Sequence, residues 1–342
     1  MDESIESLLE IPCKILKTFE EDDKWQIARK VAIYYQEKKF PYYEMDLDTR
    51  KSIFKKLVEF SADSLEIGEN ELQQNMLGLN LANYYHPQMW EVRCKGKKSP
   101  KEVFDDLELL TKAIYKRIHL SDTKLKPFNI RKSIKVFGGY GVSNFRPTIA
   151  KYVYEKFCPP NGYVLDPCMG YGGRLLGALA SSKVSFYQGY DPDKRQCDGN
   201  LLMSTELNNG KEISIINLPF EDSKDVYDRF DLVFTSPPYF NIEEYSYDET
   251  QSFIRYPTYP DWVNGFLYPL IRKSYLALKP GAYFIINVAG DRLVNSTLDV
   301  ATRTFGNEYK VKYMRLSKVL GRGDKDINKF KLEGLYIFKK ES

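Results

Sequence analysis

Histidine is nearly absent from this chain, which has only His86 and His119 among its 342 residues. Imidazole is the usual base of catalytic triads and the commonest metal ligand, so its scarcity argues against a histidine-based active site or metal centre. The five cysteines are scattered, and no two of them form a Cys-x-x-Cys pair. That pattern argues against a disulfide framework or a zinc site and is typical of free thiols in a reducing cytosol.

Long apolar runs are also missing. No stretch approaches the roughly 20 apolar residues that a membrane-spanning helix needs. Residues 1–4 lack the basic start and apolar core of a signal peptide. We therefore expect a cytoplasmic globular protein with no membrane partner. A length of 342 residues allows one large domain or two modest ones.

Acidic and basic residues are nearly balanced overall but are separated along the chain. Residues 1–92 contain 11 Lys and Arg against 18 Asp and Glu, a net charge of −7. Residues 93–135 contain 13 Lys and Arg against 5 Asp and Glu, a net charge of +8. A concentrated basic segment favours local binding of a polyanion such as nucleic acid. The alternative is a solvated helical face beside a lysine-rich linker.

The first part of the chain has the periodicity of helices. Apolar residues recur at three- and four-residue spacings in residues 25–35 and 49–60, and residues 71–85 form a third helical candidate. None of these segments contains a recognisable catalytic or ligand-binding pattern. They predict a small helical domain or cap.

A capping box marks the start of the next helix. Ser99 is followed three residues later by Glu102, which predicts a helix that begins at Pro100 and ends near residue 120. Residues 121–135 are rich in lysine and arginine and are expected to form a linker. We therefore predict a helical N-terminal domain with a basic linker over residues 1–130.

Residues 131–342 are expected to form a second domain in which strands and helices alternate. Seven apolar runs predict strands at 163–168, before and at 191, at 213–217, 230–235, 282–288, 309–316 and 334–339. Helical patterns separate most of these runs, and the last two are expected to pair as an antiparallel hairpin. Alternation of this kind predicts a three-layer α/β sandwich.

Acidic residues and glycines follow successive predicted strands, at the edge where open α/β sheets bind ligands. Asp166 ends the first strand and can pair with a cationic amino group, and Gly170 and Gly172 after it allow a close approach of the backbone. Asp191 ends the second strand, where a carboxylate can accept from both hydroxyls of a ribose. Residues 220–222 follow the third strand and suit an adenine ring with its amino group.

These positions together describe a ligand with an amino acid moiety, a ribose and an adenine, which is S-adenosylmethionine. A phosphate-binding dinucleotide loop is the competing interpretation of the glycines. A carboxylate at Asp166, directly before them, is unfavourable for a pyrophosphate and argues against that alternative.

The fourth strand ends in Ser236-Pro-Pro-Tyr239, which no strand can continue because the two prolines lack backbone N–H donors. A hydroxyl and the outward carbonyl of Pro237 form a small group of acceptors beside an aromatic ring. Such a group suits an exocyclic amino group, whose two N–H donors need two acceptors. The alternative is an ordinary Pro-Pro turn after a buried strand.

In these motifs the sequence resembles the DNA amino-methyltransferases, which methylate cytosine N4 or adenine N6. Residues 166–172 resemble the cofactor motif of that family, residues 145–147 its preceding cofactor segment, and residues 235–240 its catalytic motif. The resemblance implies a class I (Rossmann-like) methyltransferase sheet of seven strands with an antiparallel end hairpin. It implies catalytic roles for Ser236, Pro237, Pro238 and Tyr239. It implies cofactor contacts from Phe145, Arg146, Asp166, Pro167, Cys168, Gly170, Gly172, Asp191, Phe220 and Asp222.

The same resemblance implies S-adenosylmethionine as the cofactor, no metal, and DNA as the partner, either a duplex with a flipped base or a single strand. The serine form of the catalytic motif favours N4-cytosine over N6-adenine. Residues 241–262 are expected to close over the flipped base or to form a structured insertion, and the basic connection at 317–331 to lie near phosphates. Two alternatives stay open: methylation of an amino group in RNA or protein, and a non-catalytic nucleic-acid-binding module.

Overall fold

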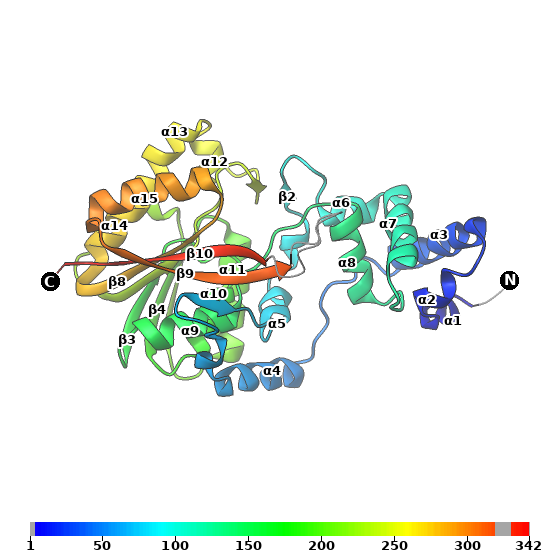
Figure 1. Ribbon diagram of the computed structural model, residues 1–342, viewed down its shortest axis with the longest axis horizontal. Coiled ribbons are helices and arrows are strands. Elements are labelled where there is room, and N and C mark those ends of the chain that lie inside the picture. The colour runs from blue at the N-terminus through cyan, green and yellow to red at the C-terminus, as the bar shows by residue number, and fades with distance from the viewer. Residues whose placement is uncertain (1–3, 319–329, 342) are drawn as a thin grey trace. The chain divides into compact units, whose positions relative to one another are not determined.

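The protein is described from a computed structural model, which covers residues 4–318 and 330–341. The chain forms two compact units. The helical unit comprises Met1–Glu44, Pro87–Ser143 and Asn241–Tyr245, and the sheet unit comprises Met45–His86, Asn144–Phe240 and Ser246–Ser342. Figure 1 labels the elements of both units.

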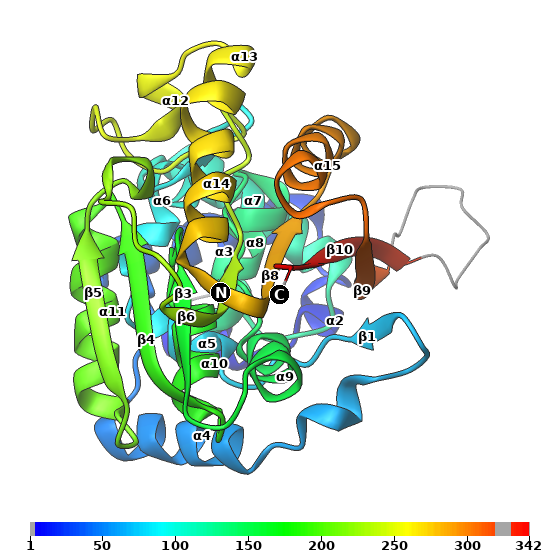
Figure 2. The same ribbon diagram turned by 90° about the vertical axis from the view of Figure 1, so that its left-hand side faces the viewer.

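The sheet unit contains an eight-stranded sheet. Its strands are β1 (Glu71–Gln73), β3 (Gly162–Asp166), β4 (Val184–Asp191), β5 (Glu212–Asn217), β6 (Phe230–Thr235), β8 (Leu278–Val288), β9 (Tyr309–Lys318) and β10 (Phe330–Lys339). Their order is β1-β9-β10-β8-β6-β3-β4-β5, as Figure 2 shows. Neighbouring strands from β5 to β8 are parallel, whereas β10 runs antiparallel to both β8 and β9.

Helices cover both faces of this sheet, and each face has its own apolar core. One face packs against α4 (Leu47–Glu59), α5 (Leu79–Tyr84), α9 (Pro147–Phe157), α10 (Gly173–Ala180) and α11 (Lys194–Leu207). The other packs against η3 (Phe220–Asp222), α13 (Tyr259–Trp262), the π-helical turn η4 (Val263–Leu267), α14 (Tyr268–Ala277) and α15 (Asp291–Phe305). The predicted three-layer sandwich is confirmed, and its mostly parallel sheet with the antiparallel strand β10 has a Rossmann-like arrangement.

The sheet has one strand more than the seven expected. Residues 71–85 were predicted to be helical, but the structure divides them into β1, which pairs in parallel with β9, and the short helix α5. Gly78, with a φ of +81°, separates the two elements. The prediction was wrong for β1 because pairing with a distant strand decides its conformation, and a three-residue strand leaves no periodic signal.

The helical unit contains α1 (Ile5–Glu10), α2 (Cys13–Leu16), α3 (Glu21–Glu37), α6 (Pro100–Asp105), α7 (Leu107–Leu120) and α8 (Pro127–Phe137). It also contains a 3₁₀ turn, η2 (Pro87–Trp90), and two short strands, β2 (Arg93–Cys94) and β7 (Glu243–Glu244), which pair antiparallel. The predicted capping box is confirmed: Ser99 Oγ accepts from the Glu102 amide, and the Glu102 carboxylate accepts from the Ser99 amide.

Two expectations for this unit need correction. The helix predicted from Pro100 to about residue 120 is interrupted at Asp106, which leaves the helical conformation and caps α7 with its side chain. The predicted linker at 121–135 contains most of α8, in which Ile130 and Ile134 are buried one turn apart. Its high lysine content obscured a helix with one apolar face.

The compact units also differ from the expected boundary at residue 130. Residues 45–86 pack with the sheet: Phe54 and Leu57 of α4 lie in its core, and Arg50 Nε donates to Glu206 Oε2 of α11 at 2.9 Å. Most of the predicted basic connection at 317–331 lies outside the described residues. In the part of the chain that the structure covers, no helix is long and apolar enough to cross a membrane.

Candidate active site

Strand β3 ends in Asp166, whose side chain has no exposed surface. Arg174, in the first turn of α10, donates from Nε to Oδ2 at 2.8 Å and from Nη2 to Oδ1 at 3.2 Å. The Tyr187 hydroxyl donates to the same Oδ2 at 2.8 Å. Burial alone would lower the pKa of Arg174, but the Asp166 carboxylate raises it above its ordinary value. Asp166 was expected to face the amino group of a ligand; its acceptors are instead used by Arg174 and Tyr187, which fix the start of the loop.

The glycines after Asp166 form a tight loop that leads into α10. Gly170 and Gly172 have φ values of +53° and +72°, a region that side chains disfavour. A Cβ atom on Gly172 would lie 2.3 Å from Oδ1 of Asn200, so no other residue fits there without movement of Asn200. A Cβ atom on Gly170 would meet nothing nearer than 4.0 Å, so the backbone of the loop is open at this point.

Two buried asparagines hold the carbonyls of this loop, and no sequence pattern identifies either of them. Asn200 of α11 donates from Nδ2 to Gly170 O at 2.9 Å, and Asn144 donates from Nδ2 to Tyr171 O at 2.8 Å. The fully buried His86 lies 3.3 Å from Asn200 Oδ1, and burial lowers its pKa to about 4. His86 is therefore neutral at physiological pH and supports the loop as an uncharged hydrogen-bonding ring.

The segment that precedes α9 lies directly against the loop. A Cβ atom on Gly173 would lie 2.1 Å from Phe145 O, so the two backbones approach as closely as glycine allows. The Phe145 ring packs edge-on against Phe234 of β6, with 5.4 Å between centroids. Arg146 donates from Nη1 to Asn144 O at 3.0 Å. The structure thus brings together the two segments that the resemblance assigned to one cofactor site.

Asp191, at the end of β4, lies beside the open part of the loop. Its Oδ2 accepts from the Gly170 amide at 3.0 Å, and its Oδ1 accepts from the Asp193 amide at 2.9 Å. Desolvation raises the pKa of Asp191 to about 7, more than these two amides lower it. The carboxylate is therefore partly protonated near neutral pH, and it lies beside the partly exposed Gly170.

Phe220 and Asp222, which were expected at an adenine ring, differ in how far their side chains are exposed. The Phe220 ring is buried against Tyr190, whereas the Asp222 side chain is exposed. Arg255, in α12 (Ser252–Arg255), donates to both Asp222 oxygens at 2.8 and 3.0 Å and to Glu221 at 3.2 Å. Arg255 lies 33 residues away in sequence, so periodicity could not identify it as the partner.

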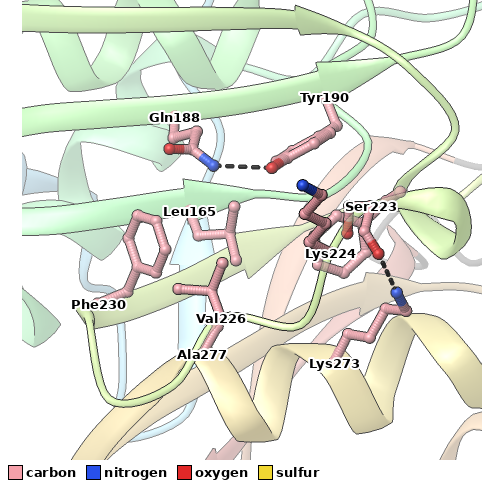
Figure 3. Close-up of a pocket in the computed structure, with 10 residues that line it drawn as sticks. Leu165, Gln188, Tyr190, Ser223, Lys224, Val226, Phe230, Lys273 and Ala277 are labelled. Carbon is pink, nitrogen blue, oxygen red and sulfur yellow. Dashed lines mark hydrogen bonds between the residues drawn. The ribbon is translucent and has the colours of Figure 1, made fainter.

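A small cavity lies between the sheet and α14 (Figure 3). Phe220 is also one of its lining residues. Its volume of about 10 Å³ leaves room for no more than about one water molecule. Gln188 Nε2 donates to the Tyr190 hydroxyl at 2.8 Å along its wall. None of residues 236–239 lines it, and its volume is too small for a substrate.

Ser236, directly after β6, is partly exposed and has one defined hydrogen bond. Its hydroxyl donates to Oδ1 of Asn287 on β8 at 3.3 Å. The orientation of the Asn287 amide follows from its second bond, because Nδ2 donates to Gly334 O at 3.0 Å. Asn287 is only 3% exposed. With its proton directed to Asn287, Ser236 Oγ keeps its lone pairs for an incoming donor.

Tyr239 is held by a contact to β10. Its hydroxyl donates to Oε1 of Glu333 at 2.8 Å, and the side chain is partly exposed. Phe240 follows with a φ of +50°, an unfavourable value for a bulky residue, and its ring packs edge-on against Tyr259 and Trp262. Pro237 is buried and Pro238 partly exposed. The chain is therefore anchored on both sides of the Pro-Pro step.

One hydrogen bond joins the end of β6, just before the Ser-Pro-Pro-Tyr turn, to the loop that follows β3. The Cys168 amide donates to Thr235 Oγ1 at 3.2 Å, one residue before Ser236. Burial and the nearby Asp166 carboxylate raise the pKa of the Cys168 thiol well above its ordinary value. The thiol therefore stays protonated and is no nucleophile. The arrangement can hold a ligand along the loop and an amino group at Ser236, side by side.

Comparisons with known proteins give similarities to methyltransferase structures. An O-methyltransferase from Thermotoga maritima, described as dependent on S-adenosylmethionine, has a TM-score of 0.41 and 14% identity, over 59% of this chain and 68% of that one. A tRNA (m1A58) methyltransferase from Aquifex aeolicus has a TM-score of 0.41 and 16% identity, over 58% and 71%. A methyltransferase from Pyrococcus furiosus has a TM-score of 0.40 and 15% identity, over 57% and 83%. No protein-family model and no curated protein matches the chain.

Proposed function

We propose that the chain transfers a methyl group from S-adenosylmethionine to an exocyclic amino group of a DNA base, with cytosine N4 favoured over adenine N6. The observation that carries the proposal is the acceptor state of Ser236, whose hydroxyl proton is directed to Asn287. An amino group presents donors, so it needs acceptors at this position. The serine form of the motif supports cytosine, through the resemblance to the amino-methyltransferases.

The described residues fit the cofactor at its ribose and at the loop. The open backbone at Gly170 and the Asp191 carboxylate beside it suit a ribose, whose hydroxyls donate to a carboxylate. Phe145 and Gly172 border the same loop, where the amino acid moiety would lie. Asp166 and Arg174 stabilise the loop from within. When bound, S-adenosylmethionine supplies an electrophilic methyl group on a positively charged sulfur.

The chain's own residues would orient the base and its amino nitrogen. The Tyr239 ring stacks on the base, and its hydroxyl, fixed by Glu333, limits rotation of the ring. Ser236 Oγ and the Pro237 carbonyl accept the two N–H donors of the amino group. This leaves the nitrogen lone pair directed out of the base plane toward the methyl group. Positioning and electrostatics therefore supply most of the rate acceleration.

The affinity for S-adenosylmethionine is expected to fall as the pH drops below 7. Ribose hydroxyls donate to the ionised form of Asp191, so cofactor binding favours the deprotonated carboxylate and lowers its pKa. Since the pKa in the free protein is about 7, affinity should be constant well above pH 7. It should weaken by about tenfold for each pH unit below 7, until the pKa of the complex is reached.

Calorimetric titration at pH 6, 7 and 8 measures this dependence. The Asp191→Asn variant is the control, because its amide does not titrate and its affinity should be nearly independent of pH. Equal pH profiles for the wild-type and variant proteins would remove Asp191 from the ribose site.

Methyl transfer from labelled S-adenosylmethionine to unmodified duplex DNA, single-stranded DNA and RNA tests the proposed function. Nucleoside analysis of the products should find the label in N4-methylcytosine. Label in N6-methyladenine would change the base but keep the reaction. Label in RNA alone, or in no nucleic acid, would overturn the assignment to DNA. The Tyr239→Ala variant serves as the control for a contaminating activity, since it should bind the cofactor but transfer little label.

A further inference from the structure

The exposed face of α8 carries a line of apolar and basic side chains. Phe128, Lys132 and Val136 are spaced four residues apart, which places them on one face of the helix. Phe128 and Val136, near the two ends of α8, are 57% and 60% exposed. On the opposite face of the helix, Ile130 and Ile134 are buried, so this segment is a packed helix and not a linker.

Just after α8, the ring of Tyr140 lies close to the ammonium groups of two lysines. The ring is 46% exposed, and its centroid lies 5.5 Å from Lys95 Nζ and 4.9 Å from Lys97 Nζ. Both lysines belong to the turn that follows β2. We call these residues and the exposed face of α8 the basic strip: Lys95, Lys97, Phe128, Lys132, Val136 and Tyr140.

The turn that holds Lys95 and Lys97 is fixed by its backbone. The Lys95 amide donates to Ile242 O at 2.7 Å, and the Lys97 amide donates to Cys94 O at 3.1 Å. The Tyr140 amide donates to Lys98 O at 3.3 Å, which joins the turn to the aromatic residue. These bonds hold the backbone of the turn in place, and the Tyr140 ring attracts both ammonium groups.

The surrounding carboxylates do not neutralise the strip. All five acidic residues of segment 93–135 form ion pairs with other basic residues: Glu102 with Arg93, Asp105 with Lys101, Asp106 with Lys98, Glu108 with Arg29 and Asp122 with Lys17. Within residues 4–318 and 330–341, no carboxylate lies within 4.0 Å of the ammonium groups of Lys95, Lys97 or Lys132. Glu243 and Glu244 lie across from β2, but they are opposite Cys94 and Arg93 and not the turn.

We propose that the basic strip binds the sugar–phosphate backbone of DNA. Lysines without carboxylate partners attract phosphates, and exposed aromatic rings offer surfaces on which bases or sugars can rest. The inference rests on the proposed function for the choice of DNA, and it adds the surface that holds the substrate outside the catalytic pocket.

The test measures the binding of a fluorescent DNA duplex and of a single strand by anisotropy, from 50 to 300 mM salt. The double variant Lys95→Ala/Lys97→Ala should bind about tenfold or more weakly at low salt. Its plot of log K against log salt should be shallower by roughly 1.8, because two phosphate contacts are lost. Tyr140→Ala should also bind more weakly, whereas Tyr140→Phe, which keeps the ring, should bind like the wild type.

The matched control is Lys124→Ala/Lys126→Ala. It removes the same charge from the same segment, but both of these lysines are paired with Glu10. The control should keep the affinity and the salt slope of the wild type. Equal losses of affinity in both double variants would show a general charge effect and overturn the proposed role of the basic strip. No loss of affinity in either double variant would also overturn it. Strip-dependent binding without methylation of DNA would instead overturn the proposed function alone.

Discussion

The Ser236→Ala variant is expected to transfer methyl groups about 10²–10³ times more slowly than the wild-type protein, because one preorganised hydrogen-bonding partner of the reacting group is lost. Its affinity for S-adenosylmethionine should stay the same, since Ser236 contacts the base and not the cofactor in the proposed site. Single-turnover rates with saturating cofactor measure the chemical step, and calorimetry measures the affinity. An unchanged rate would remove Ser236 from the catalytic group.

A variant of Asn287 tests whether the orientation of the Ser236 hydroxyl matters for the reaction. If Asn287 acts by holding the Ser236 hydroxyl in its acceptor state, Asn287→Ala should slow methyl transfer in the wild-type background. In the Ser236→Ala background, the same change should have little further effect, since the group it orients is gone. Independent losses that multiply in the double variant would show that Asn287 acts elsewhere, for example through its bond to Gly334. Unchanged cofactor affinity would confirm that each variant is folded.

Arg174→Met is expected to lower the free energy of unfolding by about 3–5 kcal/mol, because it leaves the Asp166 carboxylate buried without its cation. Both side chains are at most 5% exposed, so water cannot replace the lost partner. Urea denaturation followed by fluorescence measures the change. Part of the loss should be recovered in Asp166→Asn/Arg174→Met, which removes the buried charge together with its partner.

A surface pair gives the control for this experiment. Arg303 and Asp299 form an ion pair on α15 at 2.7 Å, with side chains 75% and 55% exposed. Arg303→Met should change the unfolding free energy little, because exposed pairs contribute little. A loss for Arg174→Met no larger than that of Arg303→Met would show that the Asp166 pair does not stabilise the loop.

The sequence predicted the structure well where an apolar run and the residues at its end mark a strand and the turn after it. Strands β3 and β4 are short apolar runs that end at Asp166 and Asp191, and β6 ends at Thr235, directly before Ser236. Turn residues follow these strand ends, so the positions of the glycine loop and of the Ser-Pro-Pro-Tyr turn in the fold could be predicted without coordinates. These patterns are local in the sequence, which is why they could be read from it.

Partners that depend on the path of the chain could not be predicted. Arg174 follows Asp166 by eight residues, yet nothing in the spacing shows that it turns back to occupy the carboxylate. Asn287 lies 51 residues from Ser236. His86 belongs to a segment that the sequence assigned to a separate domain. In each case a buried polar group found its partner through tertiary packing, which periodicity does not encode.

The division into two units limits how this protein can be truncated or fused to another protein. The chain passes between the units at five junctions: 44/45, 86/87, 143/144, 240/241 and 245/246. A truncation or a gene fusion divides the chain at one position, and no single position separates all of one unit from the other. Deletion of residues 1–130 would also take α4, β1, α5 and His86 away from the sheet. The helical unit therefore cannot be removed or exchanged as one continuous piece of the chain.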